Sequence, residues 1–277
     1  MKFNTYEKIV IVRGGGDVAS GTIQKLYRSG FSVLILEVEA PTSIRREAAF
    51  SEAIYEGQFI VEGIKAKHIE NIDEIENCWT EKIIPIMIDP KGELIYKLKP
   101  FAVIDAILAK YNLGTNRSMA PITIALGPGF IAGYDVDVVI ETMRGHNLGR
   151  LIFNGEAQKN TGVPGEINGF SKERVIYSPE HGIIENTKEI GDIICNGDII
   201  AYVNNIEVKA SMDGVLRGII RNRSKVKKET KIGDIDPRIS EKTNCYTISE
   251  KARNIAGGVL EAILYIQNKR EEKLCSH

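Results

Sequence analysis

This chain of 277 residues has no large excess of either charge, no long apolar run and no closely spaced cysteines. The 36 Lys and Arg residues nearly balance the 37 Asp and Glu residues, so the net charge of -1 gives no overall attraction to nucleic acid or an anionic membrane. No apolar run approaches the ~20 residues that a transmembrane helix needs, and the N-terminus lacks the apolar core of a signal peptide. We therefore expect no nucleic-acid partner, no membrane partner and a cytoplasmic location.

The cysteines are too dispersed for a metal centre or a disulfide framework. Cys78, Cys195, Cys245 and Cys275 occur singly, whereas zinc sites use closely spaced pairs and small disulfide-rich domains are dense in cysteine. The sequence therefore predicts reduced thiols and no metal site. With 43% hydrophobic residues, the chain is long enough for one large domain or two smaller ones.

The stretch "VIVRGGGDVASG" places three glycines between an apolar run and a helical pattern. A second apolar run, "FSVLILE", follows the helical pattern and ends at Glu37. Strand, glycine turn, helix, strand and terminal acid are the order of a dinucleotide-binding βαβ unit. The pattern predicts that Gly14, Gly15, Gly16 and Asp17 lie at a phosphate and that Glu37 accepts a ribose hydroxyl. The alternative is a tight turn with Asp17 as the N-cap of the helix.

Basic residues after this unit offer further contacts for an anion. Arg45 and Arg46 are adjacent in "PTSIRREAAF", and guanidinium groups bind phosphate oxygens in a bidentate manner. The pair therefore predicts a phosphate clamp, with a solvated helix start as the equal alternative.

A second glycine loop follows the apolar run in "PITIALGPGF". Gly127 and Gly129 would end a strand there, and the polar cluster "ETMRGHNLGR" with Arg144 and His146 comes soon after. Because ligands bind beyond the carboxyl ends of strands in open α/β sheets, we expect the two glycine loops to face one crevice with Arg144 or His146 at its rim. Between them, "PFAVIDAILAKYNLG" predicts an amphipathic helix from Pro100 to Gly114.

The sequence pattern changes from about residue 176, where short β segments alternate with turns. Segments such as "IEVKASMDGVLRGII" resemble the barrel-sandwich domains of biotinyl and lipoyl carriers, but the expected tip at Asn204 and Asn205 has no lysine to acylate. The final "ISEKARNIAGGVLEAILYIQNKREEK" predicts one helix capped by Ser249, whose Gly257 and Gly258 indicate close packing against another backbone.

These patterns together predict an α/β fold. We expect a Rossmann-like parallel sheet in residues 1-175, a smaller all-β barrel-sandwich-like domain in residues 176-236, and a C-terminal helix in residues 237-277 that packs on the α/β domain.

The segments "VIVRGGGDVASG", "ALGPGFIAGYDVDVVIETMRGHNLGR", "NTGVPGE" and "ARNIAGGVLEAIL" closely resemble the YqeB-like family of the selenium-dependent molybdenum hydroxylase system. The resemblance covers nearly the whole chain, and the family is distantly similar to the XdhC group. It implies an accessory or maturation protein that carries the molybdenum cofactor, or a nucleotide-bearing form of it, as cargo for a molybdenum hydroxylase apoprotein.

Other functions remain open at this point. Glu37 favours an NAD(P)-binding oxidoreductase or a nucleotide-sensing binder, and the β domain favours a scaffold that docks the hydroxylase. The sequence also leaves open whether the chain forms a homo-oligomer. The residues contain no triad or paired acid and base, so they do not establish an enzyme.

Overall fold

The computed structural model describes residues 8-162 and 165-275, and the chain divides into two compact units. The first unit consists of Met1–Pro41, Phe50–Asn160 and Ile248–His277. The second consists of Thr42–Ala49 and Thr161–Thr247. The chain therefore passes between the units four times, and each unit combines segments that are distant in sequence.

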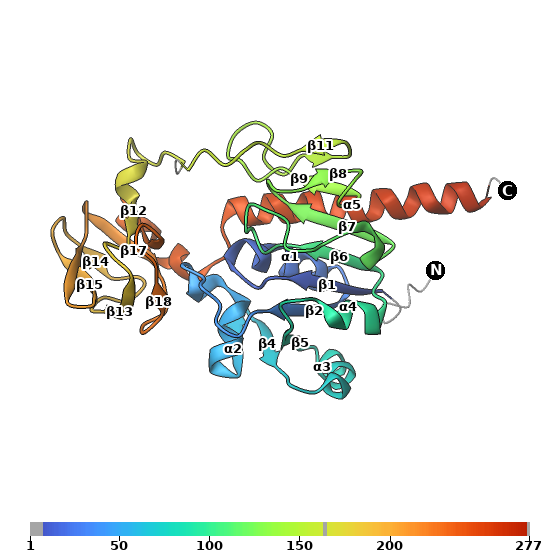
Figure 1. The fold of residues 1–277 in the computed structure, drawn as a ribbon, viewed down its shortest axis with the longest axis horizontal. Helices are drawn as coiled ribbons and strands as arrows, with labels where there is room; N and C mark the ends of the chain where they lie inside the picture. Colours follow the sequence, from blue (N-terminus) through green and yellow to red (C-terminus); the bar gives the residue numbers. More distant parts are fainter. Residues whose placement is uncertain (1–7, 163–164, 276–277) are drawn as a thin grey trace. The chain divides into compact units, whose positions relative to one another are not determined.

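A large sheet organises the first unit (Figure 1). In the described part of the chain it has nine strands in the order β10-β9-β7-β6-β1-β2-β5-β4-β3. The strands are β1 (Ile9–Arg13), β2 (Ser32–Glu37), β3 (Gln58–Val61), β4 (Ile64–His68), β5 (Ile84–Ile88), β6 (Ala102–Asp105), β7 (Ile122–Leu126), β9 (Val138–Ile140) and β10 (Leu151–Ile152). A separate ribbon pairs β8 (Ile131–Ala132) with β11 (Gly155–Glu156).

The predicted Rossmann-like parallel sheet is wrong, because the large sheet is mixed. Its central strands are parallel, but β3 runs antiparallel to β4 at one edge and β10 runs antiparallel to β9 at the other. The segment from Pro100 to Gly114, expected as a helix, instead forms β6 and an irregular loop. Val103 and Ile104 are fully buried in β6, which pairs with both β1 and β7. The unit is α/β overall, and β6 is followed by the 3-10 turn η5 (Arg117–Met119) before β7.

Helices cover both faces of the large sheet. On one face α1 (Asp17–Arg28) packs against α5 (Glu250–Cys275), and their apolar residues join Val10, Val12 and Ile104 in one core. On the other face α3 (Ile75–Thr80) and α4 (Glu93–Leu98) bury Ile11 and Val103. The remaining short elements are α2 (Ala53–Glu56), η3 (Phe50–Glu52) and η4 (Ile72–Glu74).

The predicted start of the C-terminal helix is confirmed. Ser249 precedes α5, and its Oγ accepts a hydrogen bond from the Ala252 amide at 3.2 Å. This bond satisfies one of the amides that a helix N-terminus leaves without an intrahelical acceptor.

The second unit is built from antiparallel strands. Among its described residues, one sheet has the order β12-β19-β17-β14 and another the order β16-β15-β13-β18. The strands are β12 (Val175–Tyr177), β13 (Gly182–Asn186), β14 (Ile193–Ile194), β15 (Ile199–Val203), β16 (Ile206–Lys209), β17 (Gly214–Ile219), β18 (Lys225–Val226) and β19 (Lys231–Asp236). The predicted tip is confirmed, since Asn204 and Asn205 join β15 to β16 with φ of 48° and 73°. Side chains such as Ile200, Val215 and Ile235 form a core within this unit.

The limits of the second unit differ from the boundaries expected from the sequence at residues 175 and 236. It includes η6 (Lys172–Arg174), η7 (Ile239–Tyr246) and the short segment Thr42–Ala49 with η2 (Arg46–Ala48). That segment belongs there because a Cβ on Gly218 would lie 2.8 Å from the Ile44 carbonyl oxygen, so its backbone packs directly on β17. Such a contact joins positions far apart in sequence, and no local pattern encodes it.

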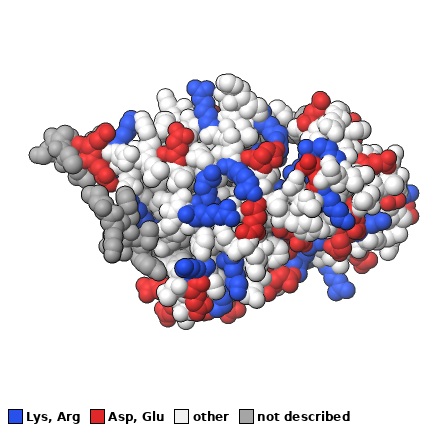
Figure 2. All heavy atoms as spheres, turned by 180° about the vertical axis from the view of Figure 1, so that it is seen from behind, with Lys and Arg blue, Asp and Glu red and all other residues white. Residues whose placement is uncertain are grey.

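The surface carries both signs of charge. Figure 2 shows Lys and Arg interspersed with Asp and Glu on the face that it presents. Among the described residues, no helix has the length and apolar character required to cross a lipid bilayer.

Candidate functional site

The strand order of the large sheet marks one place where loops gather. From β1 the chain proceeds to β2 and β5 on one side, whereas β6, β7 and β9 lie on the other side. Ligands of open α/β sheets bind at the carboxyl ends of the strands where the strand order reverses in this way. The candidate site is therefore the edge that carries residues 14-16 after β1 and residues 106-114 after β6.

The opening glycines allow close packing of backbone at this edge. Gly14 has a φ of +94°, and a Cβ there would lie 3.0 Å from the Ala106 carbonyl oxygen. A Cβ on Gly15 would lie 3.0 Å from the Ser51 nitrogen, and the Ser51 amide donates to the Gly15 carbonyl at 2.9 Å. Any side chain at these two positions would displace a neighbouring segment, so the glycines have a structural role whether or not a ligand binds.

Helix α1 begins directly after this turn. Gly16 is its N-cap residue, with φ -64° and ψ 178°, and it has no side chain that could cap the helix. The expectation that Asp17 is the N-cap is therefore wrong, because Asp17 is the first helical residue. Amides in the first turn of a helix lack intrahelical acceptors and favour a nearby anion. The start of α1 therefore favours an anion, although the Asp17 carboxylate opposes a second negative charge.

Glu37 lies beside the same turn at the end of β2. Its Oε2 accepts the Gly15 amide at 2.7 Å, and its Oε1 accepts the Val38 amide at 2.8 Å. Burial raises the pKa of Glu37 above its usual value, although the two amide hydrogen bonds lower it in part. The carboxylate thus already occupies the Gly15 amide that a pyrophosphate was expected to use. The remaining lone pairs of this carboxylate can still accept a hydrogen bond from a ribose hydroxyl.

Sequence reasoning missed a buried polar network next to this turn. Arg13, only 1% exposed at the end of β1, donates to Thr115 Oγ1 at 2.5 Å and to the Pro90 carbonyl at 3.0 Å. Thr115 Oγ1 in turn donates to Asp105 Oδ2 at 2.5 Å, and Arg13 Nη1 lies 3.6 Å from the same carboxylate oxygen. Burial raises the pKa of Asp105, while the Thr115 hydrogen bond and the Arg13 charge lower it in part. The available signal was a charged residue at the end of each apolar run, in "VIVR" and "AVID".

This network fixes both ends of the loop at residues 106-114. Asp105 precedes the loop and Thr115 follows it, so their hydrogen bond closes its base. The loop contains Leu108 and Lys110 with φ of 59° and 68°, a region that side-chain-bearing residues rarely adopt. Strain of this kind concentrates at functional sites.

The second glycine loop lies at the same edge of the sheet, with β6 between it and the first. A Cβ on Gly129, where φ is +107°, would lie 2.6 Å from the Tyr111 backbone. A Cβ on Gly127 would lie 2.5 Å from Thr142 Oγ1. Because the loop at 106-114 touches both Gly14 and Gly129, it lies between the two glycine loops that were expected to face one crevice.

The polar cluster after β9 follows the same edge of the sheet. Glu141 is buried, and its carboxylate accepts the amides of Met143 and Gln158 at 2.7 and 2.8 Å. Arg144 is 41% exposed and pairs with Glu250 at 2.7 Å. His146 is exposed as well. Both predicted rim residues are therefore accessible, and their role at a ligand stays a prediction.

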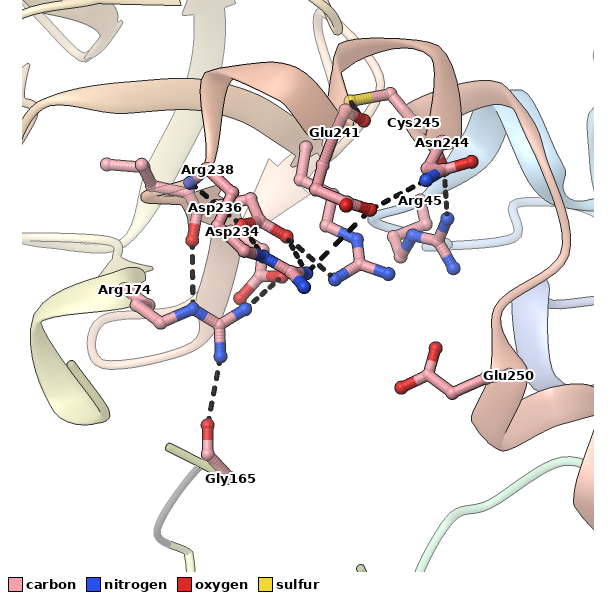
Figure 3. Close-up of polar contacts among 12 residues, drawn as sticks. Arg45, Gly165, Arg174, Asp234, Asp236, Arg238, Glu241, Asn244, Cys245 and Glu250 are labelled. Carbon is pink, nitrogen blue, oxygen red and sulfur yellow. Dashed lines mark hydrogen bonds and ion pairs between the residues drawn. The ribbon is translucent and has the colours of Figure 1, made fainter. Parts of the chain in front are cut away.

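Arg45 and Arg46 belong to the second unit, where other groups hold them. Arg45 Nη2 donates to the carbonyls of Asn244 and Thr247 at 3.0 and 2.8 Å, next to η7 (Figure 3). Arg46 Nη2 pairs with Glu189 at 2.8 Å. These contacts give both side chains a structural role, and the phosphate clamp stays a prediction.

An ion-pair cluster lies in the second unit near Arg45 in Figure 3. Asp236, 1% exposed, accepts Arg238 Nε and Nη2 at 2.9 and 2.8 Å and lies 3.2 Å from Arg217 Nη1. Burial alone would raise the pKa of Asp236, but the hydrogen bonds from Arg238 and the charges of both arginines outweigh it and lower the pKa. Arg174 Nε also donates a hydrogen bond to the Ile235 carbonyl at 3.1 Å. The cluster fixes the end of β19.

The chain is thus an α/β protein of two units with a candidate ligand site at one edge of a mixed sheet. No family model matches it. It is 47% identical over 262 residues to the uncharacterized protein YqeB of Escherichia coli (strain K12), a match that covers 95% of this chain and 48% of that protein. This similarity supports the YqeB-like relationship expected from the sequence. The chain spans about half the length of the curated relative that it matches.

Two solved structures show remote likenesses to this chain. The ectoine utilization protein EutE (DoeB) from Ruegeria pomeroyi is 10% identical, with a TM-score of 0.26 and coverage of 84% of this chain and 86% of that one. A succinylglutamate desuccinylase from Silicibacter sp. TM1040 is 14% identical, with a TM-score of 0.24 and coverage of 84% and 85%. Their TM-scores are too low for any activity to be carried over to this chain.

Proposed function

We propose that this chain binds a phosphate-bearing small ligand at the edge formed by the loops after β1 and β6. We further propose that the ligand is the molybdenum cofactor, or a nucleotide-bearing form of it. The chain would then serve in the cytoplasm as an accessory or maturation protein of selenium-dependent molybdenum hydroxylases. The observation that carries the binding proposal is the position of the α1 N-terminus, which follows the glycine turn directly and lies where the strand order reverses.

The chemistry of this edge fits a phosphate. The first-turn amides of α1 are directed donors, and the helix dipole adds a partial positive charge of about half a unit at that end. Gly16 carries no side chain that would cover these donors. Since the Gly15 amide is held by Glu37, the phosphate would contact the amides that follow Gly16.

The cargo role rests on the YqeB-like relationship together with this edge. A cofactor that is passed to an apoprotein must be held by reversible contacts, and hydrogen bonds from backbone amides are of that kind. The partner in this proposal is the hydroxylase apoprotein, which would receive the cofactor. We assign no chemical step to the chain.

A titration of purified molybdenum cofactor into the wild type and Gly16→Val tests the proposal. The backbone angles of Gly16 suit any residue, so valine should leave the fold intact while its branched side chain covers the first-turn amides. We expect the wild type to bind and the variant to lose at least about tenfold in affinity, equivalent to ~1.4 kcal/mol.

Gly257→Ala is the matched control, because among the described atoms nothing lies within 4 Å of a Cβ at that position of α5. The control should bind as the wild type does. Negligible binding by all three proteins, or equal binding by the wild type and Gly16→Val, would contradict the proposal.

Glu37 favours a second candidate, an NAD(P)-binding oxidoreductase or a nucleotide-sensing binder. Its carboxylate lies at the end of β2 against the glycine turn, which is where a ribose hydroxyl would be accepted. A nicotinamide nucleotide at about 100 times its dissociation constant would stabilise the protein by ~2.7 kcal/mol. A thermal shift with NAD(P) that disappears in Glu37→Gln would favour this candidate, and no shift with any nicotinamide nucleotide would remove it.

A further inference from the structure

An apolar surface of the first unit lies across the β8-β11 ribbon and α5. It consists of five exposed side chains, with exposed fractions between 41% and 78%: Ile131, Tyr134, Phe153, Leu264 and Tyr265. Single exposed apolar residues are common, but contiguous ones mark interaction sites.

Contacts and neighbouring positions link Ile131, Tyr134, Phe153 and Tyr265 into one surface. The rings of Phe153 and Tyr265 lie 5.1 Å apart at an interplanar angle of 47°. Ile131 pairs with Glu156 in the β8-β11 ribbon, and a Cβ on Gly133 would lie 3.5 Å from the Phe153 carbonyl oxygen. Tyr134, the most exposed of the five, follows Gly133 directly. The surface therefore runs from the ribbon across Phe153 onto α5.

Helix α5 contributes charges of opposite sign on either side of Tyr265. Glu261 lies four residues before Tyr265 and Lys269 four residues after it, and both are exposed. With a rise of about 1.5 Å per residue, each charge is roughly 6 Å along the helix from Tyr265. The Lys269 Nζ lies 4.5 Å from the centre of the Tyr265 ring, so this cation is part of the same surface. Figure 1 shows the C-terminal end of α5 extending past the strands of the large sheet.

We propose that this surface is the interface of a homodimer in which α5 helices from two copies pack antiparallel about a two-fold axis at Tyr265. In such a pair the residue four positions before the axis faces the residue four positions after it. Glu261 of each copy then meets Lys269 of the other, so the contact forms twice. A two-fold interface must be self-complementary in this way, with an apolar centre and a polar rim.

The charge pattern favours a second copy over a different occupant. Glu261 and Lys269 lie at equal spacing on either side of Tyr265, which is the pattern that a second copy of this helix would match. A strongly acidic or basic partner would leave one of these two charges beside a like charge.

Sedimentation velocity over the micromolar range tests the dimer with charge-reversal variants. Lys269→Glu and Glu261→Lys each place like charges together twice, and each should raise the dimer dissociation constant about tenfold. The double variant Lys269→Glu/Glu261→Lys restores both opposite-charge contacts and should dimerise like the wild type. This restoration requires the antiparallel arrangement and would not follow from damage to the fold.

Lys97→Glu is the matched control, because it makes the same charge change at an exposed position of α4. It should leave the dimer unchanged. A wild type that stays monomeric at the highest concentration, a double variant that does not recover, or an equal effect of Lys97→Glu would overturn the proposal. The test involves no ligand, so its outcome is independent of the proposed function.

Discussion

Gly257 and Gly258 are neighbours in α5, yet the structure predicts opposite effects when each is replaced by alanine. A Cβ on Gly258 would overlap the carbonyl oxygen of Gly149 and lie 3.2 Å from Ile140 Cγ2. Among the described atoms, nothing lies within 4 Å of a Cβ on Gly257. The sequence shows two equivalent glycines, and only the packing separates them.

The two effects can be estimated from helix propensity and packing. Alanine is favoured over glycine in a helix interior by ~0.8-1.0 kcal/mol, so Gly257→Ala should raise the free energy of unfolding by roughly that amount. Gly258→Ala gains the same propensity but must displace backbone, and overpacking of this kind costs ~1-3 kcal/mol. We expect a net loss of about 1 kcal/mol, and thus a difference of about 2 kcal/mol between the two variants.

Urea unfolding followed by tryptophan fluorescence measures this difference in the appropriate part of the molecule. Trp79 is the single tryptophan, it lies in the first unit with α5, and its Nε1 donates to the Val33 carbonyl at 2.8 Å. The midpoints should move in opposite directions while the slope of free energy against urea stays constant. Equal stabilisation by both substitutions would refute the close approach of α5 to Gly149.

The remaining predictions concern binding and pH. Arg144→Gln should weaken binding of the proposed ligand by ~1.5-3 kcal/mol if Arg144 makes a charge-assisted hydrogen bond, whereas Arg221→Gln in the second unit should not; equal losses in calorimetry would argue against a rim role. The pKa of Glu37 is raised in the folded state, so the folded first unit binds the Glu37 proton more tightly than the unfolded chain does. The free energy of unfolding of this unit should therefore fall as pH rises from the ordinary carboxyl value through the raised one. In fluorescence-detected unfolding, Glu37→Gln should flatten this dependence of stability on pH. The pKa of Asp236 is lowered in the folded state, so its effect on stability depends on pH in the opposite direction. Protection of β19 amides from hydrogen exchange should be lost as pH falls below the ordinary carboxyl value. If this loss at low pH is the same in Asp236→Asn, the prediction is wrong.

Local patterns were sufficient where neighbouring residues decide the conformation. The apolar runs at β1, β2 and β7, the helix pattern of α1 and the Asn204-Asn205 turn all appear in the structure at the expected places. Asparagine tolerates a positive φ, and a β-branched apolar run between turn residues favours a strand, so these features need no distant partner. Glycines at the candidate edge were also identified from the sequence, although their close neighbours were not.

Local patterns failed where a distant segment decides the outcome. The apolar spacing from Pro100 to Gly114 fits a helix, but Val103 and Ile104 are buried between β1 and β7, and pairing on both sides overrides the weak helical preference. Arg45 has the chemistry of a phosphate ligand in any sequence, and only the tertiary structure brings it to the carbonyls beside η7.

The sequence by itself determined the strands and turns that depend on a few adjacent residues, the start of α5 at Ser249 and the glycine turn at the candidate site. The tertiary structure alone decided that antiparallel strands complete the edges of the large sheet and that Thr42–Ala49 belongs to the second unit. It also brought Arg13, Asp105 and Thr115 together. The physical reason is that hydrogen bonds and buried ion pairs between distant segments depend on where the chain returns in space, which is a property of the whole fold.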